Sequence, residues 1–308
     1  APVTAMSHFF CRRPSLFISA CVWVTTTLLS HANPATATEA ELTAIIDDHW
    51  QWTLAQYPER RLEYGDRSGN GQWTDMSLDA FQRRYEDEGQ FVQRLEQIEP
   101  ATLSADGQVN RSMLLRQLRD NLTEYEDGLH LIALDMRSGP QHRHSMIDTL
   151  PMVSAQDHED WLNRLRGLPE QLSQYRALLS EGINRDRTQA QIVMSRVPSQ
   201  IANLMTEQPN DSPFYRAFAT MPEEIDSDTR ASLQSAAATV IDEQINPALR
   251  ELFEFLESDY LPAARPPGIG ALPGGKQVYS RLAQHFTNVF QGFFGRERHP
   301  HAPLRTCS

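Results

Sequence analysis

WLNRLRGLPEQLSQYRALL, residues 161–179, is the stretch that decides the fold class. Its large apolar side chains alternate between spacings of four and three residues, the rhythm of a helix that packs against other helices. These side chains are Trp161, Leu165, Leu168, Leu172, Tyr175 and Leu179. Pro169 interrupts the run and lacks the backbone N–H that an α-helix needs, so we expect a kink or a break after Gly167.

The same helical period recurs on both sides of this stretch. Thr38 and Glu41 have capping-box spacing ahead of a helix that Pro58 ends, and Ser77 is expected to cap the next helix. A long helix is expected over 226–260, with a kink at Asn246–Pro247. The apolar stripes are Phe81, Tyr85, Val92, Leu95 and Ile98; Val109, Met113, Leu118, Leu122, Tyr125, Leu129 and Ile132; and Leu233, Ala237, Val240, Ile245, Leu249, Leu252 and Leu256.

Two segments lack this regularity. Residues 135–154 mix turn formers with apolar residues and are expected to cross between helical layers, and 206–214 read as a loop. A further helix is expected over 192–205, bent by Pro198. No stretch shows sustained strand alternation, and no repeat of fixed period appears. The sequence therefore predicts an all-α fold, with long amphipathic helices packed as an irregular multi-helix array over residues 38–288.

The first 37 residues have the pattern of a leader. Arg12 and Arg13 precede an apolar stretch over 15–29 that is too short for a transmembrane helix, and small residues follow it. We interpret this as a signal peptide, with translation starting at Met6; an uncleaved membrane anchor is the alternative. The protein is then exported to the periplasm or the extracellular space and has no membrane span after cleavage.

Charge and cysteine content exclude some classes of protein. The formal net charge is −12, which disfavours a nucleic-acid partner because phosphate binding needs clustered Lys and Arg. Cys11 and Cys21 would leave with the leader, so only Cys307 remains. An exported chain with one cysteine has no internal disulfide, and its stability must come from packing.

The sequence predicts no catalytic residue, no metal ligand set and no cofactor in this chain. There is no His-Glu-x-x-His helix and no Gly-x-Ser-x-Gly elbow. His142 and His144 lie two residues apart in a loop and are interpreted as surface histidines, and His158 precedes a helix. The carboxylates on the polar helix faces are interpreted as solvated: Asp47, Asp48, Glu86, Asp87, Glu88, Glu124, Glu126 and Asp127.

One Gly/Pro-rich stretch, RPPGIGALPGGKQVY over residues 265–279, suggests a special backbone conformation. Gly274 and Gly275 allow either a tight turn between helices or the close approach of a ligand. A phosphate loop is disfavoured, because Gln277 follows Lys276 where Ser or Thr is required and no strand precedes it.

This stretch resembles a segment of the bacterial family called domain of unknown function 885. The matching residues are Tyr260, Pro262, Arg265, Gly268, Leu272, Pro273, Gly275, Tyr279 and Leu282. Upstream, Pro58 with Tyr64-Gly65-Asp66, and the stretch from Arg164 to Pro169, fit the family's N-terminal half, so the resemblance covers residues 40–288.

The resemblance implies a helical fold similar to zinc carboxypeptidases, with a peptide substrate and zinc in full-length relatives. Their metal-binding elements lie in a C-terminal half that this chain lacks, so no catalytic residue is carried over. The residues implied to line a substrate cleft are Arg265, Gly274, Gly275, Lys276 and Tyr279. The chain is then expected to be an incomplete part of a larger peptidase-like fold.

Residues 289–308 depart from the family pattern and are expected to form an aberrant, disordered tail, from truncation or a frameshift; a naturally short paralogue is the alternative. The prediction is an exported, peptidase-like family protein that is catalytically inactive in this form, although the sequence leaves open whether it is an enzyme. The alternative is a non-catalytic helical binding or scaffold protein of the periplasm. Self-association through exposed apolar helix faces is expected, because the tail carries few apolar residues to cover them.

Overall fold

The computed structural model describes residues 34–287. Helices make up nearly all of the regular structure in that range, which contains no β-strand; Ala190 and Arg265 form an isolated bridge. The predicted all-α fold is confirmed. The predictions for the leader up to residue 33 and for the tail from 288 onwards lie outside the described residues.

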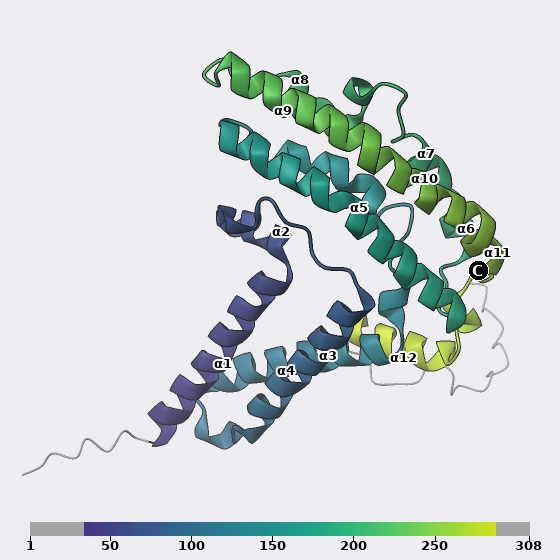
Figure 1. Ribbon diagram of the computed structural model, residues 1–308. Coiled ribbons are helices and arrows are strands. Elements are labelled where there is room, and N and C mark those ends of the chain that lie inside the picture. The colour runs from purple at the N-terminus through teal and green to yellow at the C-terminus, as the bar shows by residue number, and fades with distance from the viewer. Residues whose placement is uncertain (1–33, 288–308) are drawn as a thin grey trace, which may run out of the picture.

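The first group of helices comprises α1 (Pro34–Gln56), α3 (Leu78–Gln97) and α4 (Ala105–Glu126), in which α3 and α4 form an antiparallel hairpin (Figure 1). The side chains of Ser77 and Ser104 accept hydrogen bonds from the first turns of α3 and α4, which confirms the predicted cap at Ser77. The group has its own core: Leu42, Ile45, Phe91, Val92, Leu95, Ile98, Leu103, Leu115 and Leu118.

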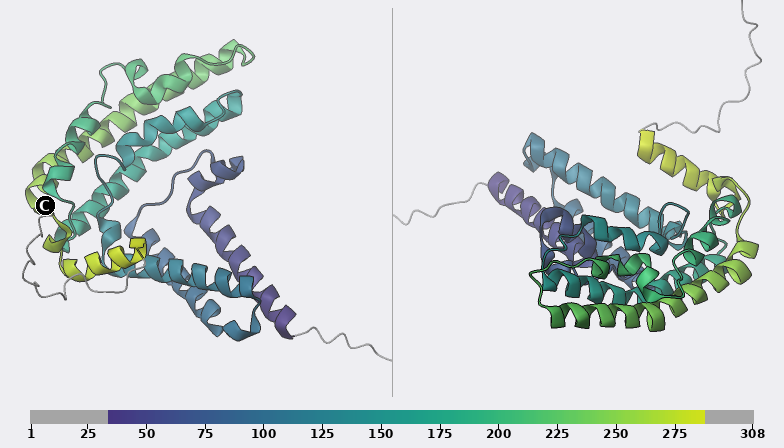
Figure 2. Two further views of the ribbon diagram at one scale, coloured as in Figure 1. Left: turned by 180° about the vertical axis from the view of Figure 1, so that it is seen from behind. Right: turned by 90° about the horizontal axis from the view of Figure 1, so that it is seen from above.

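The second group is built on α5 (Ala155–Asn184), which runs beside the long helix of α9 (Ser227–Val240) and α10 (Asn246–Phe255) (Figure 1 and Figure 2). The six large apolar side chains predicted to face other helices, from Trp161 to Leu179, are all buried on α5. Because α5 is packed on the core of this group along its length, it continues through Pro169, and the alternative of a break there is wrong.

The long helix contains two π-helical turns, Ile241–Ile245 and Leu256–Tyr260, which lead into α10 and into α11 (Leu261–Ala263). Each turn precedes a proline, Pro247 or Pro262, by two residues. Since proline offers no N–H and its ring crowds the carbonyl one turn earlier, a widened turn lets the helix continue. The kink predicted at Asn246–Pro247 stays a prediction, and the structure has a π turn directly before it, at Ile241–Ile245.

Other predicted boundaries differ from the structure. The first helix begins at Pro34 rather than at the capping box of Thr38 and Glu41. The helix expected over 192–205 is two short helices, α6 (Gln191–Met194) and α7 (Val197–Ala202), with Pro198 in the first turn of α7. The remaining helices are α2 (Pro58–Arg61), α8 (Arg216–Ala219) and α12 (Gly275–Thr287), with 3-10 turns at Leu62–Tyr64, Arg67–Gly69, Pro100–Thr102, Leu129–Leu131, Pro140–Thr149, Pro209–Asp211, Pro213–Tyr215 and Ile269–Ala271.

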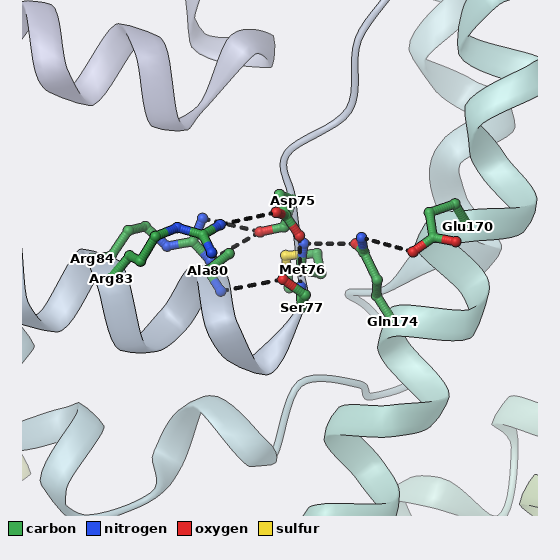
Figure 3. Close-up of polar contacts among 8 residues, drawn as sticks. All are labelled: Asp75, Met76, Ser77, Ala80, Arg83, Arg84, Glu170 and Gln174. Carbon is green, nitrogen blue, oxygen red and sulfur yellow. Dashed lines mark hydrogen bonds and ion pairs between the residues drawn. The ribbon is translucent and has the colours of Figure 1, made fainter.

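The segment between α2 and α3 connects the two groups (Figure 3). The backbone nitrogen of Met76 donates to the side-chain oxygen of Gln174 on α5 at 2.8 Å. One residue earlier, the carbonyl oxygen of Asp75 accepts from both terminal nitrogens of Arg84 on α3, each at 3.0 Å. This segment thus fixes the guanidinium of Arg84 and sets α3 against α5.

Arg164, the most buried cation of α5, holds an earlier part of the same segment. Its side chain is fully buried and donates to the carbonyl oxygens of Gly69 and Asn70. The guanidinium also lies 4.7 Å from the ring centre of Trp73. Burial lowers the pKa of Arg164 to about 10. The fold thus uses Arg164 to bind backbone carbonyls.

Candidate functional site

Among the residues expected to line a substrate cleft, Arg265 is engaged with neighbouring backbone. Its Nε donates to the carbonyl oxygen of Thr188 at 2.9 Å, and its Nη1 donates to that of Gly268 at 2.8 Å. Its backbone nitrogen also donates to the carbonyl oxygen of Gln189. Arg265 thus ties the end of the long helix to the segment that follows α5.

Gly274 and Gly275 form the tight turn that starts α12. Gly274 has a φ of +66°, a conformation that favours glycine. A Cβ on Gly275 would clash with the carbonyl oxygen of Ile269. The turn between helices, one of the two sequence alternatives, therefore accounts for both glycines.

Lys276 and Tyr279 lie on the exposed side of α12, where Tyr279 is 43% exposed. The described residues nearby form a groove of about 380 Å³ between α12 and α4, lined from α12 by Val278, Arg281, Leu282, Gln284 and His285. A role of the five predicted residues in a substrate cleft stays a prediction.

Polar contacts fasten α12 to α4 along this groove. Arg281 forms an ion pair with Asp127, and His285 Nδ1 lies 2.8 Å from Asp120 Oδ2. Arg116 Nη2 donates to the carbonyl oxygen of His285 at 3.3 Å. Residue numbers rise along α12 as they fall along α4, so the two helices run antiparallel.

A second cavity of about 420 Å³ lies between α1, α2, α3 and α4, and we call it the aromatic pocket. It shares Glu124 and Leu129 with the groove. Its lining residues are His49, Trp52, Thr53, Tyr57, Arg60, Phe81, Arg84, Tyr85, Glu88, Gln117, Asn121, Glu124, Tyr125, Leu129 and His130.

Stacked rings form one wall of the aromatic pocket. The ring centres of Tyr85 and Tyr125 are 4.6 Å apart, and those of Tyr125 and His130 are 4.4 Å apart. The Tyr125 hydroxyl donates to Gln82 Oε1 at 2.6 Å, and the Tyr85 hydroxyl donates to Glu126 Oε1 at 3.0 Å. These bonds hold the rings in place, so the wall is preformed.

Two charged residues of α3, Arg84 and Glu88, are buried at the same pocket, 4% and 8% exposed. Burial raises the pKa of Glu88, against the opposing effects of the hydrogen bond from Asn121 Nδ2 (2.9 Å) and of Arg84. The guanidinium of Arg84 lies over the ring of Phe81 at 4.5 Å, and burial lowers its pKa. Its Nε has no hydrogen-bond partner in the described structure.

The two histidines of the pocket favour the neutral form. Burial, followed by the charges of Arg185 and Arg84, lowers the pKa of His130 to about 4. Burial and then Arg60 lower the pKa of His49. Near neutral pH the pocket therefore combines aromatic faces, uncharged imidazoles and a buried cation next to a buried carboxyl group, an arrangement suited to binding a ligand with apolar and polar parts.

Residues 58–290 match the family model described as bacterial protein of unknown function, DUF885. The chain belongs to the DUF885 family. A search of curated proteins finds no match. A crystal structure of a protein from Colwellia psychrerythraea, described as a "putative lipoprotein", superimposes with a TM-score of 0.71 at 14% identity. The match covers 82% of this chain and 46% of that one, so this DUF885 chain spans about half of that protein.

Zinc does not fit the part of this DUF885 chain that the structure describes. Within residues 34–287, no group of three or more His, Cys, Asp and Glu side chains is placed to hold a metal ion. His142 Nε2 lies 3.3 Å from the carbonyl oxygen of Met136, and His144 Nδ1 lies 3.1 Å from that of Gln141. Both histidines are half-buried rather than on the surface, because they pack into the 3-10 segment before α5.

Sequence reasoning missed the aromatic pocket because Glu88 was interpreted as solvated, and that interpretation is wrong. Glu88 lies four residues after Arg84 and three before Phe91, so all three fall on the buried stripe of α3. The signal available in the sequence was this pair of charged residues, which occupies positions where the helical period calls for apolar side chains.

Across 34–287, no helix of this DUF885 chain is long and apolar enough to span a membrane.

Proposed function

We propose that this chain is the peptide-binding part of an exported, peptidase-like protein, and that the aromatic pocket binds the peptide. The main observation in support is the wall of stacked rings, which lies beside two buried charged residues. The rings are those of Tyr85, Tyr125 and His130, and the charged residues are Arg84 and Glu88. A peptide presents apolar side chains together with amide and charged groups, and this wall offers partners for each. The resemblance to helical zinc carboxypeptidases supports a peptide over other ligands with the same chemistry.

Export is supported by the leader pattern at the N-terminus and by the description of the similar Colwellia protein. We propose that the chain binds peptides without hydrolysing them. The family resemblance implies a zinc ion for full-length relatives. The absence of a suitable group of ligands among the described residues supports this proposal. The residues of the pocket then bind and orient the peptide, and no step of bond cleavage is assigned to them.

Calorimetric titration of the full chain with short capped peptides tests the binding proposal. Acetyl-Gly-Phe-Gly-amide is expected to bind roughly tenfold more tightly than acetyl-Gly-Ala-Gly-amide, because a ring can stack on the wall. Tyr125→Ala should remove this preference. Tyr64→Ala is the matched control, since Tyr64 is 62% exposed and lies outside the pocket.

Three outcomes would contradict the proposal, two of them for the binding site and one for the inactive form. Equal weak binding of both peptides, or an effect of Tyr64→Ala as large as that of Tyr125→Ala, would remove the aromatic pocket as the binding site. Peptide hydrolysis that depends on added zinc would contradict the inactive form while leaving binding intact. Circular dichroism of each variant establishes that it is folded.

A further inference from the structure

Arg84 of α3 is a buried cation that has no carboxylate partner among the described residues. Both of its terminal nitrogens donate to the backbone carbonyl oxygen of Asp75 (Figure 3). The carboxylate of Asp75 pairs instead with the exposed Arg83, at 3.3 Å. The ion pairs formed within residues 34–287 do not include Arg84. Because a buried charge is costly without an opposite charge, Arg84 calls for an anion.

The third nitrogen of Arg84, Nε, is the atom that is free to bind one. It is buried and has no hydrogen-bond partner in the part of the chain that the structure describes. The guanidinium lies against two rings, with its central carbon 4.5 Å from the ring centre of Phe81 and 5.4 Å from that of Tyr57. Buried N–H groups without an acceptor are rare in folded proteins. Since Arg84 lines the aromatic pocket, a ligand there can supply the acceptor.

Arg164, the other buried arginine in the described range, has a partner for each nitrogen. Its Nε and Nη2 donate to the carbonyl oxygens of Asn70 and Gly69, and its Nη1 lies 3.0 Å from the sulfur of Met146. Arg164 lines neither the groove nor the aromatic pocket. The unpaired Nε therefore distinguishes Arg84 from an arginine that only holds the fold together.

Positive charge also acts on the rings of the pocket. After burial, the causes that lower the pKa of His130 are the charges of Arg185 and Arg84. Burial and then Arg60 lower the pKa of His49. Both imidazoles therefore lie in a positive potential, which attracts an anion. The Nδ1 of His130 is buried without a partner as well, so it can bond a second polar atom of the ligand.

The two acidic residues that line the pocket leave the charge of Arg84 available. Glu88 accepts its hydrogen bond from Asn121, and burial raises the pKa of Glu88, which favours the uncharged carboxyl. Glu124 is exposed to solvent, where water screens its charge. Neither residue forms an ion pair with Arg84 in the described structure, so a ligand anion does not have to displace one.

We propose that the aromatic pocket binds a carboxylate of its ligand, with the Nε–H of Arg84 as the donor. The inference rests on the proposed function, because it assigns one polar contact of the peptide bound there. In a peptide this carboxylate belongs either to the C-terminus or to an Asp or Glu side chain. Hydrogen bonds between charged groups are stronger than neutral ones, so the carboxylate should bind more tightly than the matching amide.

Calorimetric titration of the full chain with two matched pairs of peptides tests the proposal and separates the two sources. The first pair is acetyl-Gly-Phe with a free C-terminus and acetyl-Gly-Phe-amide. The second is acetyl-Asp-Phe-amide and acetyl-Asn-Phe-amide. In the pair that matches the source, the acid should bind roughly tenfold more tightly than its amide. Arg84→Gln should remove this preference, whereas Arg83→Gln, at an exposed arginine outside the pocket, should keep it.

The outcomes separate this inference from the function on which it rests. Equal binding of acid and amide in both pairs, with phenylalanine still preferred over alanine, would overturn the carboxylate contact and leave peptide binding intact. A preference for the acid that survives Arg84→Gln would overturn the contact too. Loss of the preference for phenylalanine would overturn the proposed function and this inference with it.

A second measurement uses the unaltered chain, because Arg84→Gln also removes the hydrogen bonds to Asp75. Nuclear magnetic resonance of the ¹⁵N-labelled protein observes the arginine Nε–H groups directly. One solvent-protected Nε–H proton should move downfield when the preferred acid is added and stay in place with its amide, since a carboxylate is the stronger acceptor. Nε–H signals that stay unchanged with the acid, or that move equally with both peptides, would overturn the contact.

Discussion

The hydroxyl oxygen of Tyr260 accepts a hydrogen bond of 2.8 Å from the backbone nitrogen of Gln189. Tyr260 is fully buried at the end of the second π turn, and Gln189 lies in the segment that follows α5. Arg265 binds the same segment through Thr188. The Tyr260-x-Pro-x-x-Arg265 part of the family segment therefore fastens the long helix to the segment after α5.

Replacing Tyr260 with phenylalanine should destabilise the chain by about 1–2 kcal/mol, because a partly buried N–H loses its acceptor while the ring still fills its site. Urea unfolding followed by circular dichroism measures the change. Tyr64→Phe is the control: its side chain is 62% exposed, and its substitution should change stability by less than about 0.5 kcal/mol. Equal stability of Tyr260→Phe and the parent chain would contradict this role.

Glu88→Gln should stabilise the chain at neutral pH. Burial raises the pKa of Glu88, so the folded state favours the protonated carboxyl and becomes less stable as the pH rises through that pKa. Glutamine is uncharged and can still accept the hydrogen bond from Asn121 Nδ2. Melting temperatures at pH 7 and pH 4.5 should show a gain over the parent chain that narrows at the lower pH.

The control for this change is Glu86→Gln, an exposed carboxyl on the same helix, whose melting temperature should follow the parent chain at both pH values. A lower melting temperature for Glu88→Gln at pH 7 would mean that the charged carboxylate stabilises the pocket, contrary to the expectation.

His130 should make the chain less stable in mild acid. Its pKa is lowered to about 4 in the folded state, whereas the unfolded value is near 6.5. The unfolded state therefore binds the extra proton between these values, and stability is lost as the pH falls from about 6.5 to about 4. His130→Phe keeps a ring beside Tyr125 and should remove this contribution, which unfolding at pH 7 and pH 5 measures. A histidine signal titrating near 6.5 and assigned to residue 130 would refute the shift.

The helices could be predicted from sequence where a regular stripe of apolar residues faces the core. The seam from Trp161 to Leu179 is buried as its spacing requires, and Ser77 caps its helix. The continuity of α5 through Pro169 could not be predicted, because it depends on tertiary packing around the proline. Likewise, Met113 fits the period of α4 yet is exposed, since periodicity does not say which neighbour is present.

The aromatic pocket depends on contacts between segments that are distant in sequence. His130 reaches the ring of Tyr125 because Gly128, with a φ of +70°, turns the chain back after α4. Glu88 finds its partner Asn121 on a neighbouring helix. Sequence reasoning singled out the glycine-rich turn before α12, because its backbone conformation requires glycine at particular positions. A pocket assembled from four helices leaves a weaker signal, which here is the apolar stripe of α3 interrupted by charged residues.

Gly275→Ala should loosen α12, because the added Cβ would clash with the carbonyl oxygen of Ile269 and the backbone of Gly270. Gly270→Ala is the matched control in the same turn, since a Cβ there meets no atom within 4 Å. Amide hydrogen exchange should be faster across α12 in Gly275→Ala, while the amides of α5 keep their protection. Arg281 and His285 form the ion pairs that join α12 to α4. A displaced α12 would weaken these pairs, so the groove between the two helices should widen with the same substitution. Equal exchange in both variants would show that the turn tolerates a side chain at Gly275 and that α12 is held by its ion pairs alone.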